Sequence, residues 1–225
     1  STVSAFFSSD YRKMFATDIR TNYRKIDQDG RNNISLSLLP RIRLSDKLSF
    51  FMDFSYDILN NDQGFVNRTL IPEVIQQDVG LSSTDIMIGK RKLEIFENSI
   101  RGQFIFTNRQ SLSLRIRHYN ATVIYNSLGI LDQDGSISDL YFDGLNEEEN
   151  PIFDRNFNAF TVDMNYLWRF APGSDVILNF KSEISGEDDG YDSSYLENIG
   201  GVFDQYQENS LSLRIVYYLD YLYFK

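Results

Sequence analysis

Leu211-Ser-Leu-Arg-Ile-Val-Tyr-Tyr-Leu-Asp-Tyr-Leu-Tyr-Phe-Lys225 is the stretch that decides the fold. Every second residue from Leu211 to Tyr223 is apolar or aromatic, and the intervening set begins with Ser212 and Arg214. This period of two predicts a β-strand with two different faces. The predicted strand is longer than the roughly five or six residues usual in soluble sheets. It is long enough to cross a bilayer, which takes about 9–11 residues, and the tyrosines that end its apolar face favour membrane interfaces.

The same alternation recurs along the whole chain, in which aromatic residues make up 15%. It predicts about eight further strands before the terminal one. They cover residues 1–7, Tyr11–Ile26, Ile34–Leu44, Leu48–Ile58, Phe96–Thr107, Ser111–Tyr125, Phe160–Phe170 and Val176–Glu183. A shift of phase near His118 predicts a β-bulge at that point.

The connections between these strands alternate between short and long. The short turns are Ser45–Lys47, Asn108–Gln110 and Ala171–Asp175, and the long polar connections are Leu59–Asp85, Ser127–Arg155 and Ser185–Ser210. Bacterial outer-membrane barrels show this asymmetry, with tight periplasmic turns and long extracellular loops.

We therefore predict an all-β fold, an antiparallel transmembrane β-barrel of the outer-membrane type, in a single domain over residues 1–225. An odd number of strands, with no signal peptide at the start, predicts the C-terminal part of a larger barrel that is incomplete at its N-terminal side. One alternative is a closed barrel of eight strands whose first segment is a tail. The other is a soluble β protein, which has the same alternation with its apolar face turned inward.

Composition excludes several function classes. The net charge of −10 and the lack of a basic face argue against a nucleic-acid partner. The chain has no cysteine, and His118 is its single histidine, so neither a His-based triad nor a multi-histidine metal site can form within it. No apolar run approaches the length of a transmembrane helix.

The polar positions of the predicted strands carry charges of both signs. We predict that the lumen is lined by Arg41, Arg43, Asp53, Arg115, Arg117, Asp163, Lys181 and Arg214. These residues form either a mutually neutralising network or a selectivity lining. The residues predicted to face lipid are Phe160, Val162, Met164, Trp168, Leu213, Ile215 and Leu219.

The predicted loops have features of their own. Asp27-Gln-Asp-Gly30 and Asp132-Gln-Asp-Gly135 resemble fragments of calcium loops but lack the spacing of an EF-hand, which favours turns. The acidic runs Glu147–Glu149 and Glu187–Asp189 are typical of solvated loops. Aromatic residues within Ser127–Arg155 and Ser185–Ser210 predict that both connections pack as a cap over the barrel mouth or onto a partner protein.

Several stretches resemble the C-terminal barrel region of large Bacteroidota outer-membrane proteins, a domain of unknown function that follows an N-terminal module similar to carbohydrate-binding family 9. The most specific are Tyr166-Leu-Trp-Arg-Phe-Ala-Pro-Gly-Ser174 and Asn209-Ser-Leu-Ser-Leu-Arg-Ile-Val-Tyr-Tyr-Leu-Asp-Tyr221. Others are Ser9–Lys13, Leu112–Tyr119, Asp132–Gly135 and Asn158–Asp163. No carbohydrate-binding module is visible in this chain, so a role in sugar binding is implied by the resemblance alone.

The expected function is that of a non-enzymatic component of the bacterial outer membrane, with no cofactor. It acts in surface binding or uptake, with glycans as the implied ligand, or as an accessory subunit of an outer-membrane complex. Its expected partners are outer-membrane lipid and a glycan or protein at the extracellular loops. The alternative is a barrel enzyme with a site at the rim, formed by acidic residues such as Glu147–Glu149, Asp188 and Asp189.

Overall fold

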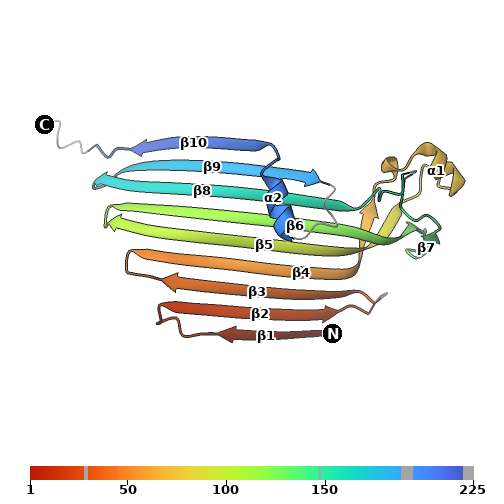
Figure 1. Ribbon diagram of the computed structural model, residues 1–225, viewed down its shortest axis with the longest axis horizontal. Helices are drawn as coiled ribbons and strands as arrows, with labels where there is room; N and C mark the ends of the chain where they lie inside the picture. Colours follow the sequence, from red (N-terminus) through yellow and green to blue (C-terminus); the bar gives the residue numbers. More distant parts are fainter. Residues whose placement is uncertain (28–29, 147, 189–194, 220–225) are drawn as a thin grey trace.

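The computed structural model describes residues 1–27, 30–146, 148–188 and 195–219. Its strands all belong to one antiparallel sheet of ten strands. Nine of them follow one another across the sheet, in the order β1-β2-β3-β4-β5-β6-β8-β9-β10, and the short β7 pairs with β6 (Figure 1). The prediction of an all-β antiparallel fold is therefore confirmed.

The elements have the following bounds. The strands are β1 (Thr2–Ser8), β2 (Phe15–Lys25), β3 (Asn32–Arg43), β4 (Leu48–Val66), β5 (Met87–Thr107), β6 (Gln110–Leu131), β7 (Ile137–Leu140), β8 (Arg155–Ala171), β9 (Ser174–Asp188) and β10 (Gln207–Val216); the helices are η1 (Arg68–Leu70), α1 (Glu73–Asp78) and α2 (Tyr195–Val202).

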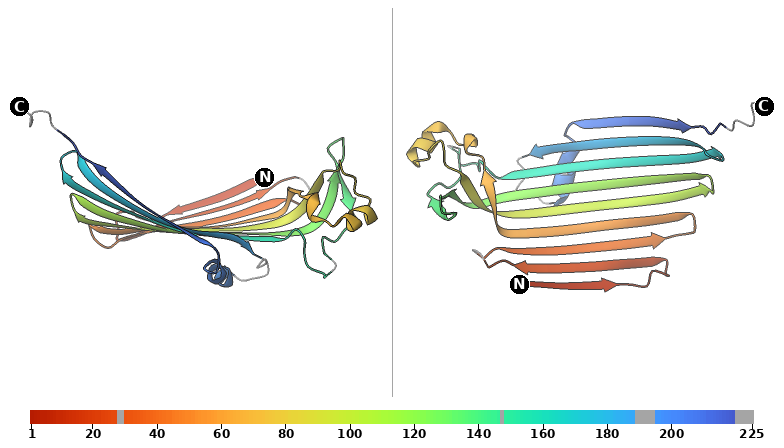
Figure 2. Two further views of the ribbon diagram at one scale, coloured as in Figure 1. Left: turned by 90° about the horizontal axis from the view of Figure 1, so that it is seen from above. Right: turned by 180° about the vertical axis from the view of Figure 1, so that it is seen from behind.

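The sheet is open. β1 and β10 lie at its opposite edges and do not pair with each other, and Figure 2 shows how strongly the sheet twists between them. Every residue of both edge strands is exposed. The structure thus shows the antiparallel sheet but not a closed barrel, and the expected pairing of a first and last strand in an eight-stranded barrel is absent among the described strands.

The central strands are longer than the alternation predicted. β4 runs eight residues past Ile58, to Val66, and β5 begins at Met87 instead of Phe96. The extra length was hidden because pairing there shifts register at two bulges, between Leu59 and Asp62 and between Lys90 and Arg91. Two helices, η1 and α1, also lie within the predicted polar connection.

Two other local predictions need correction. No bulge lies at His118, which pairs in regular register with Asn98 on β5 and Phe160 on β8. The change of pattern there reflects polar residues on the apolar face beneath α2, not an inserted residue. The terminal strand is also shorter than predicted, because β10 ends at Val216, and residues 220–225 lie outside the described part of the chain.

The short and long connections gather at opposite ends of the sheet, as predicted. The turns after β3, β5 and β8 lie at one end, on the left in Figure 1. α1 and β7 lie at the other end, which we call the loop end, and β9 ends and β10 begins on that side of the sheet. None of the described helices is long and apolar enough to span a membrane.

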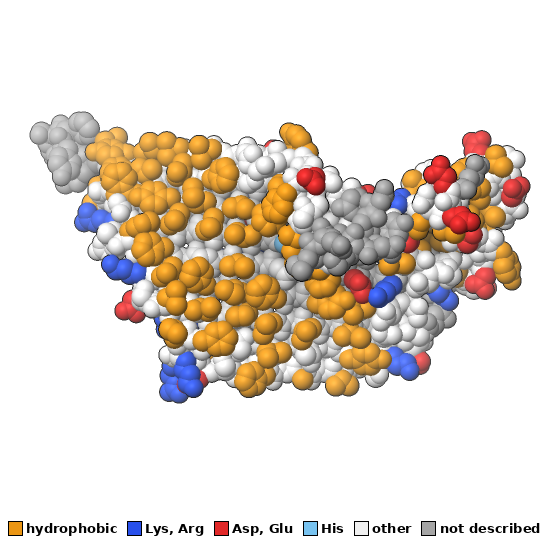
Figure 3. All heavy atoms as spheres, viewed as in Figure 1, with side chains coloured by type: hydrophobic (Ala, Val, Ile, Leu, Met, Phe, Trp, Pro, Cys, Tyr) orange, Lys and Arg blue, Asp and Glu red, His pale blue; other side chains and the backbone are white. Residues whose placement is uncertain are grey.

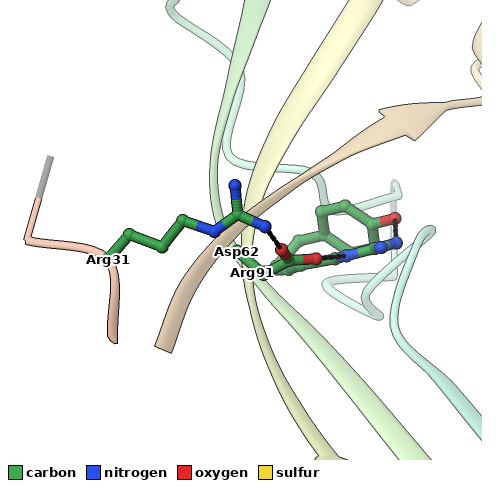
Figure 4. A network of polar contacts seen from close by, with 4 residues as sticks. Arg31, Asp62 and Arg91 are labelled. Carbon is green, nitrogen blue, oxygen red and sulfur yellow. Dashed lines mark hydrogen bonds and ion pairs between the residues drawn. The ribbon is translucent and has the colours of Figure 1, made fainter. Parts of the chain in front are cut away.

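The clearest hydrophobic core lies at the loop end, where the outer parts of β4, β5 and β6 meet α1, β7 and the segment before β8. It is built from Val66, Ile71, Met87, Leu128, Leu140 and Phe153. A buried carboxylate beside this core joins β4 to β5 and to the residue before β3. Asp62 is 5% exposed and accepts hydrogen bonds from Arg31 Nη2 at 2.5 Å and from Arg91 Nε at 3.1 Å (Figure 4). Arg91 also donates to the Tyr125 hydroxyl at 3.3 Å.

Candidate binding face

The two faces of the sheet carry different kinds of side chain. Paired residues on neighbouring strands lie on the same face, so the pairing shows which residues belong to each face. One row of paired residues shows the first face. It consists of Phe15, Ile42, Phe50, Gly102, Leu114, Met164, Phe180 and Leu211. We call this the apolar face, and Figure 3 shows hydrophobic side chains spread across it.

The adjacent row lies on the opposite side of the same strands. It consists of Ala16, Arg41, Phe51, Arg101, Arg115, Asp163, Lys181 and Ser210. We call this the polar face and its row the arginine row. All eight residues predicted to line a lumen lie on the polar face, four of them in the arginine row and the others in neighbouring rows. Six of the seven residues predicted to face lipid lie on the apolar face, and Leu219 follows the last strand.

Some charges of the polar face neutralise one another. Arg117 Nη2 lies 2.9 Å from Asp163 Oδ2, and Lys181 Nζ lies 2.6 Å from Glu183 Oε2. These side chains are between a third and a half exposed, so solvent screening leaves each pair with little net effect on folding. Two separate ion pairs therefore lie on the polar face, each with one member in the arginine row, and the neutralising network stays a prediction.

A hollow of about 370 Å³ lies on the polar face beside the arginine row. Arg41, Arg101 and Arg115 line it together with Asp18 and Asp53. The Arg41 guanidinium is held between two aromatic rings, 4.9 Å from the centre of Tyr11 and 4.8 Å from that of Phe51. Such cation–π contacts fix the direction of the guanidinium without using its hydrogen-bond donors.

The apolar face has a polar border at the loop end. There the amide of Asn120 donates to Asn156 at 2.7 Å and to Asn158 at 3.0 Å, and all three side chains are buried. α2 lies against this face in front of β5, β6 and β8 (Figures 1 and 2). The connection Ser185–Ser210 was predicted to cap the mouth of a barrel. Its helix α2 instead covers part of the apolar face of the sheet.

Tyr195 fastens α2 to the sheet. Asn98 Nδ2 donates to its hydroxyl at 2.5 Å, His118 Nδ1 lies 3.0 Å from the same oxygen, and its ring packs 4.7 Å from that of Phe96. Burial raises the pKa of Tyr195, so the hydroxyl stays protonated at neutral pH.

We expect Tyr195→Phe to weaken this attachment by about 1–2 kcal/mol, because it leaves the buried His118 and the half-buried Asn98 without their shared partner. Hydrogen exchange of the backbone amides of α2 in the full-length protein measures the effect. Tyr206→Phe is the control, since Tyr206 is 82% exposed. Equal exchange in both variants would show that the hydroxyl does not hold the helix.

The connection Ser127–Arg155 packs differently from its predicted form as a loop. Its first residues extend β6, Ile137–Leu140 form β7, and Leu140 and Phe153 enter the loop-end core. Tyr141 is 95% exposed and takes no part in it. This connection thus packs against the ends of β4, β5 and β6, and its predicted role as a cap over a barrel mouth stays a prediction.

The described acidic residues do not gather into a metal site. Among them, no group of three or more ligating side chains that could hold a metal ion is present. Asp132 and Asp134 accept hydrogen bonds from Ser136, which lower the pKa of Asp134 and make Asp132–Gly135 a turn between β6 and β7. Glu147, Asp189 and residues 28–29 of the other Asp-rich turn lie outside the described residues.

Sequence reasoning missed Arg101, which the structure places directly opposite Arg115. Its alternation put it on the polar face, and the tight turn at Asn108–Gln110 fixes the register of β5 and β6. Counting residues along β5 and β6 from that turn pairs Arg101 with Arg115, provided that the irregularity between Ile105 and Thr107 is included. The residues of the Asn98–His118–Tyr195 cluster had no such signal, because α2 was not predicted.

The fold and the polar face together define a class: an all-β protein built on one open antiparallel sheet with an apolar and a charged face. The chain belongs to the family described as Domain of unknown function (DUF5916), whose model matches residues 1–225. A comparison with curated proteins finds no match.

Proposed function

We propose that this sheet is part of the wall of a transmembrane β-barrel in a bacterial outer membrane, with its apolar face toward lipid and its polar face toward the lumen. The observation that carries the proposal is the uncharged apolar face. From Leu48 to Tyr56 on β4, and along the paired stretches of the other described strands, this face has no Asp, Glu, Lys or Arg. A soluble monomer rarely leaves more than a few hundred Å² of contiguous apolar surface uncovered.

The height of the apolar face supports the same proposal. Its uncharged part extends over nine residues of β4, Leu48–Tyr56, which at about 3.4 Å per residue and a tilt of about 40° gives about 23 Å. This matches the apolar band of outer-membrane barrels. Trp168 and Tyr166 lie near its short-turn end, where aromatic girdles are expected.

The two open edges point to further strands. In hydrocarbon the unpaired amide and carbonyl groups of β1 and β10 would each cost several kcal/mol. We therefore infer that additional strands pair with both edges and close a barrel larger than this sheet. In that barrel the tight turns face the periplasm and the loop end faces outward.

Within that barrel, the chain serves as a non-enzymatic component for surface binding or uptake, or as an accessory subunit of an outer-membrane complex. The resemblance to Bacteroidota proteins with a carbohydrate-binding family 9-like module makes glycans the first ligands to test. A barrel enzyme with a site at the rim remains the alternative prediction; among the described residues, no group of three or more ligating side chains that could hold a metal ion is present.

Cell fractionation of the source bacterium tests the proposal. We expect the full-length protein in the outer-membrane fraction, resistant to extraction by alkaline carbonate. We also expect its mobility in a denaturing gel to change on heating, as it does for folded barrels. Recovery in the soluble fraction, with no effect of heating, would contradict it.

A further inference from the structure

The arginine row contains an unfavourable contact that its surroundings do not relieve. Arg101 on β5 pairs directly with Arg115 on β6, which brings two positive side chains together on one face. Like charges in directly opposite positions of antiparallel strands are destabilising. Among the described residues, neither arginine has an ion pair, and Arg115 Nε is buried without a hydrogen-bond partner.

Three carboxylates lie near these two arginines, and among the described residues none of them forms an ion pair with either one. Asp18 lines the hollow on the side of Arg41, with which its charge interacts. Asp163 pairs with Arg115 across the strands, but its carboxylate is bound to Arg117. Asp53 lines the same hollow, and its Oδ1 accepts from Ser55 at 3.3 Å. Two guanidinium groups on the polar face are thus left with free donors.

The three arginines border a hollow that is large enough for a small ligand. Arg41, Arg101 and Arg115 line the hollow of about 370 Å³, which falls within the roughly 300–1,000 Å³ of small-molecule sites. Arg41 is already oriented by Tyr11 and Phe51. Arginine forks match oxyanions because two parallel N–H groups can meet two oxygens.

We propose that Arg101 and Arg115, with Arg41 beside them, bind the oxyanion of a small soluble ligand: a carboxylate, sulfate or phosphate group. The anion neutralises the Arg101–Arg115 pair and takes up their free donors. The proposal names the ligand class of the binding or uptake role, and it rests on that proposed function because the barrel lumen is what gives solutes access to the polar face.

Isothermal titration of the full-length protein in detergent, at low ionic strength, tests the site with malonate as probe. Malonamide is the matched neutral ligand, and sulfate extends the test to tetrahedral anions. We expect malonate to bind and malonamide not to bind. Arg101→Gln and Arg115→Gln should each weaken malonate binding at least tenfold. Arg214→Gln is the control, since it removes one charge from the same face away from the hollow.

A second measurement separates a ligand site from a structural one. Without anion, Arg115→Gln should raise the melting midpoint, by about 1–3 °C, because it removes the like-charge contact. Wild-type binding of malonate no tighter than of malonamide would overturn the proposal. So would a lower midpoint of Arg115→Gln, which would mean that a carboxylate from elsewhere in the protein already pairs with it. Failure of the membrane location would instead appear in fractionation, which these variants leave unchanged.

Discussion

The full-length protein carrying Leu114→Arg should lose most of its membrane-assembled form, whereas Ser113→Arg should assemble normally. The two residues are neighbours on β6 and point to opposite faces. Leu114 lies on the apolar face between Gly102 and Met164, and Ser113 lies on the polar face between Gln103 and Asn165. An arginine facing lipid near mid-membrane costs about 2–4 kcal/mol.

The measurement is the fraction of heat-modifiable protein after refolding into lipid vesicles. Comparing Leu114→Arg with Ser113→Arg cancels any effect that a new arginine has anywhere on β6, since the two variants differ in the face that carries it. A penalty of this size lowers the ratio of assembled to unassembled protein by roughly 30- to 1,000-fold at a given denaturant concentration. Equal loss in both variants, or loss in Ser113→Arg alone, would contradict the assignment of the faces.

The second large effect should come from Asp62→Asn at the loop end. This carboxylate is 5% exposed and holds Arg31 and Arg91 together, so its neutralisation leaves two guanidinium groups partly buried without a counter-charge (Figure 4). Removing one partner of a buried ion pair typically costs 3–5 kcal/mol. We expect about 3 kcal/mol here, because Arg31 and Arg91 keep 31% and 25% of their side chains exposed.

Hydrogen exchange of the amides around Met87 and Leu128 measures the change, since both residues belong to the adjacent core. Asp46→Asn, in the exposed turn between β3 and β4, is the control and should have no effect on these amides. A difference below about 1 kcal/mol between the two variants would show that the Asp62 network does not stabilise the loop end.

The sheet could be predicted because apolar and polar residues alternate regularly wherever one face of a strand is apolar and the other is polar. From Phe160 to Tyr166, or from Met52 to Ile58, apolar and polar residues alternate without a break, and the register of antiparallel neighbours follows from tight turns. The same regularity placed Arg115 and Asp163 on one face correctly. These predictions needed only local information.

The rest depended on contacts between distant segments. β4 and β5 continue past Asp62 and Arg91 because bulges shift their register while a buried ion pair and the loop-end core hold them together. His118 breaks the apolar pattern where it contacts Tyr195 of α2, and Asn120 breaks it where it donates to Asn156 and Asn158. α2 comes from a connection that was predicted to be a polar loop. Neither effect leaves a periodic signal in the sequence.

Single-cysteine spin labelling along β8 tests the central claim most directly, since the chain has no cysteine of its own. Labels are placed one at a time from Phe160 to Tyr166 in the full-length protein in vesicles, and their exposure to oxygen and to a water-soluble nickel complex is compared. A period of two is expected: Val162, Met164 and Tyr166 meet oxygen in the lipid, and Thr161, Asp163 and Asn165 meet the nickel complex in water. If the labels at Val162 and Met164 are instead shielded from both reagents, the apolar face is packed inside a protein core and the membrane wall is ruled out.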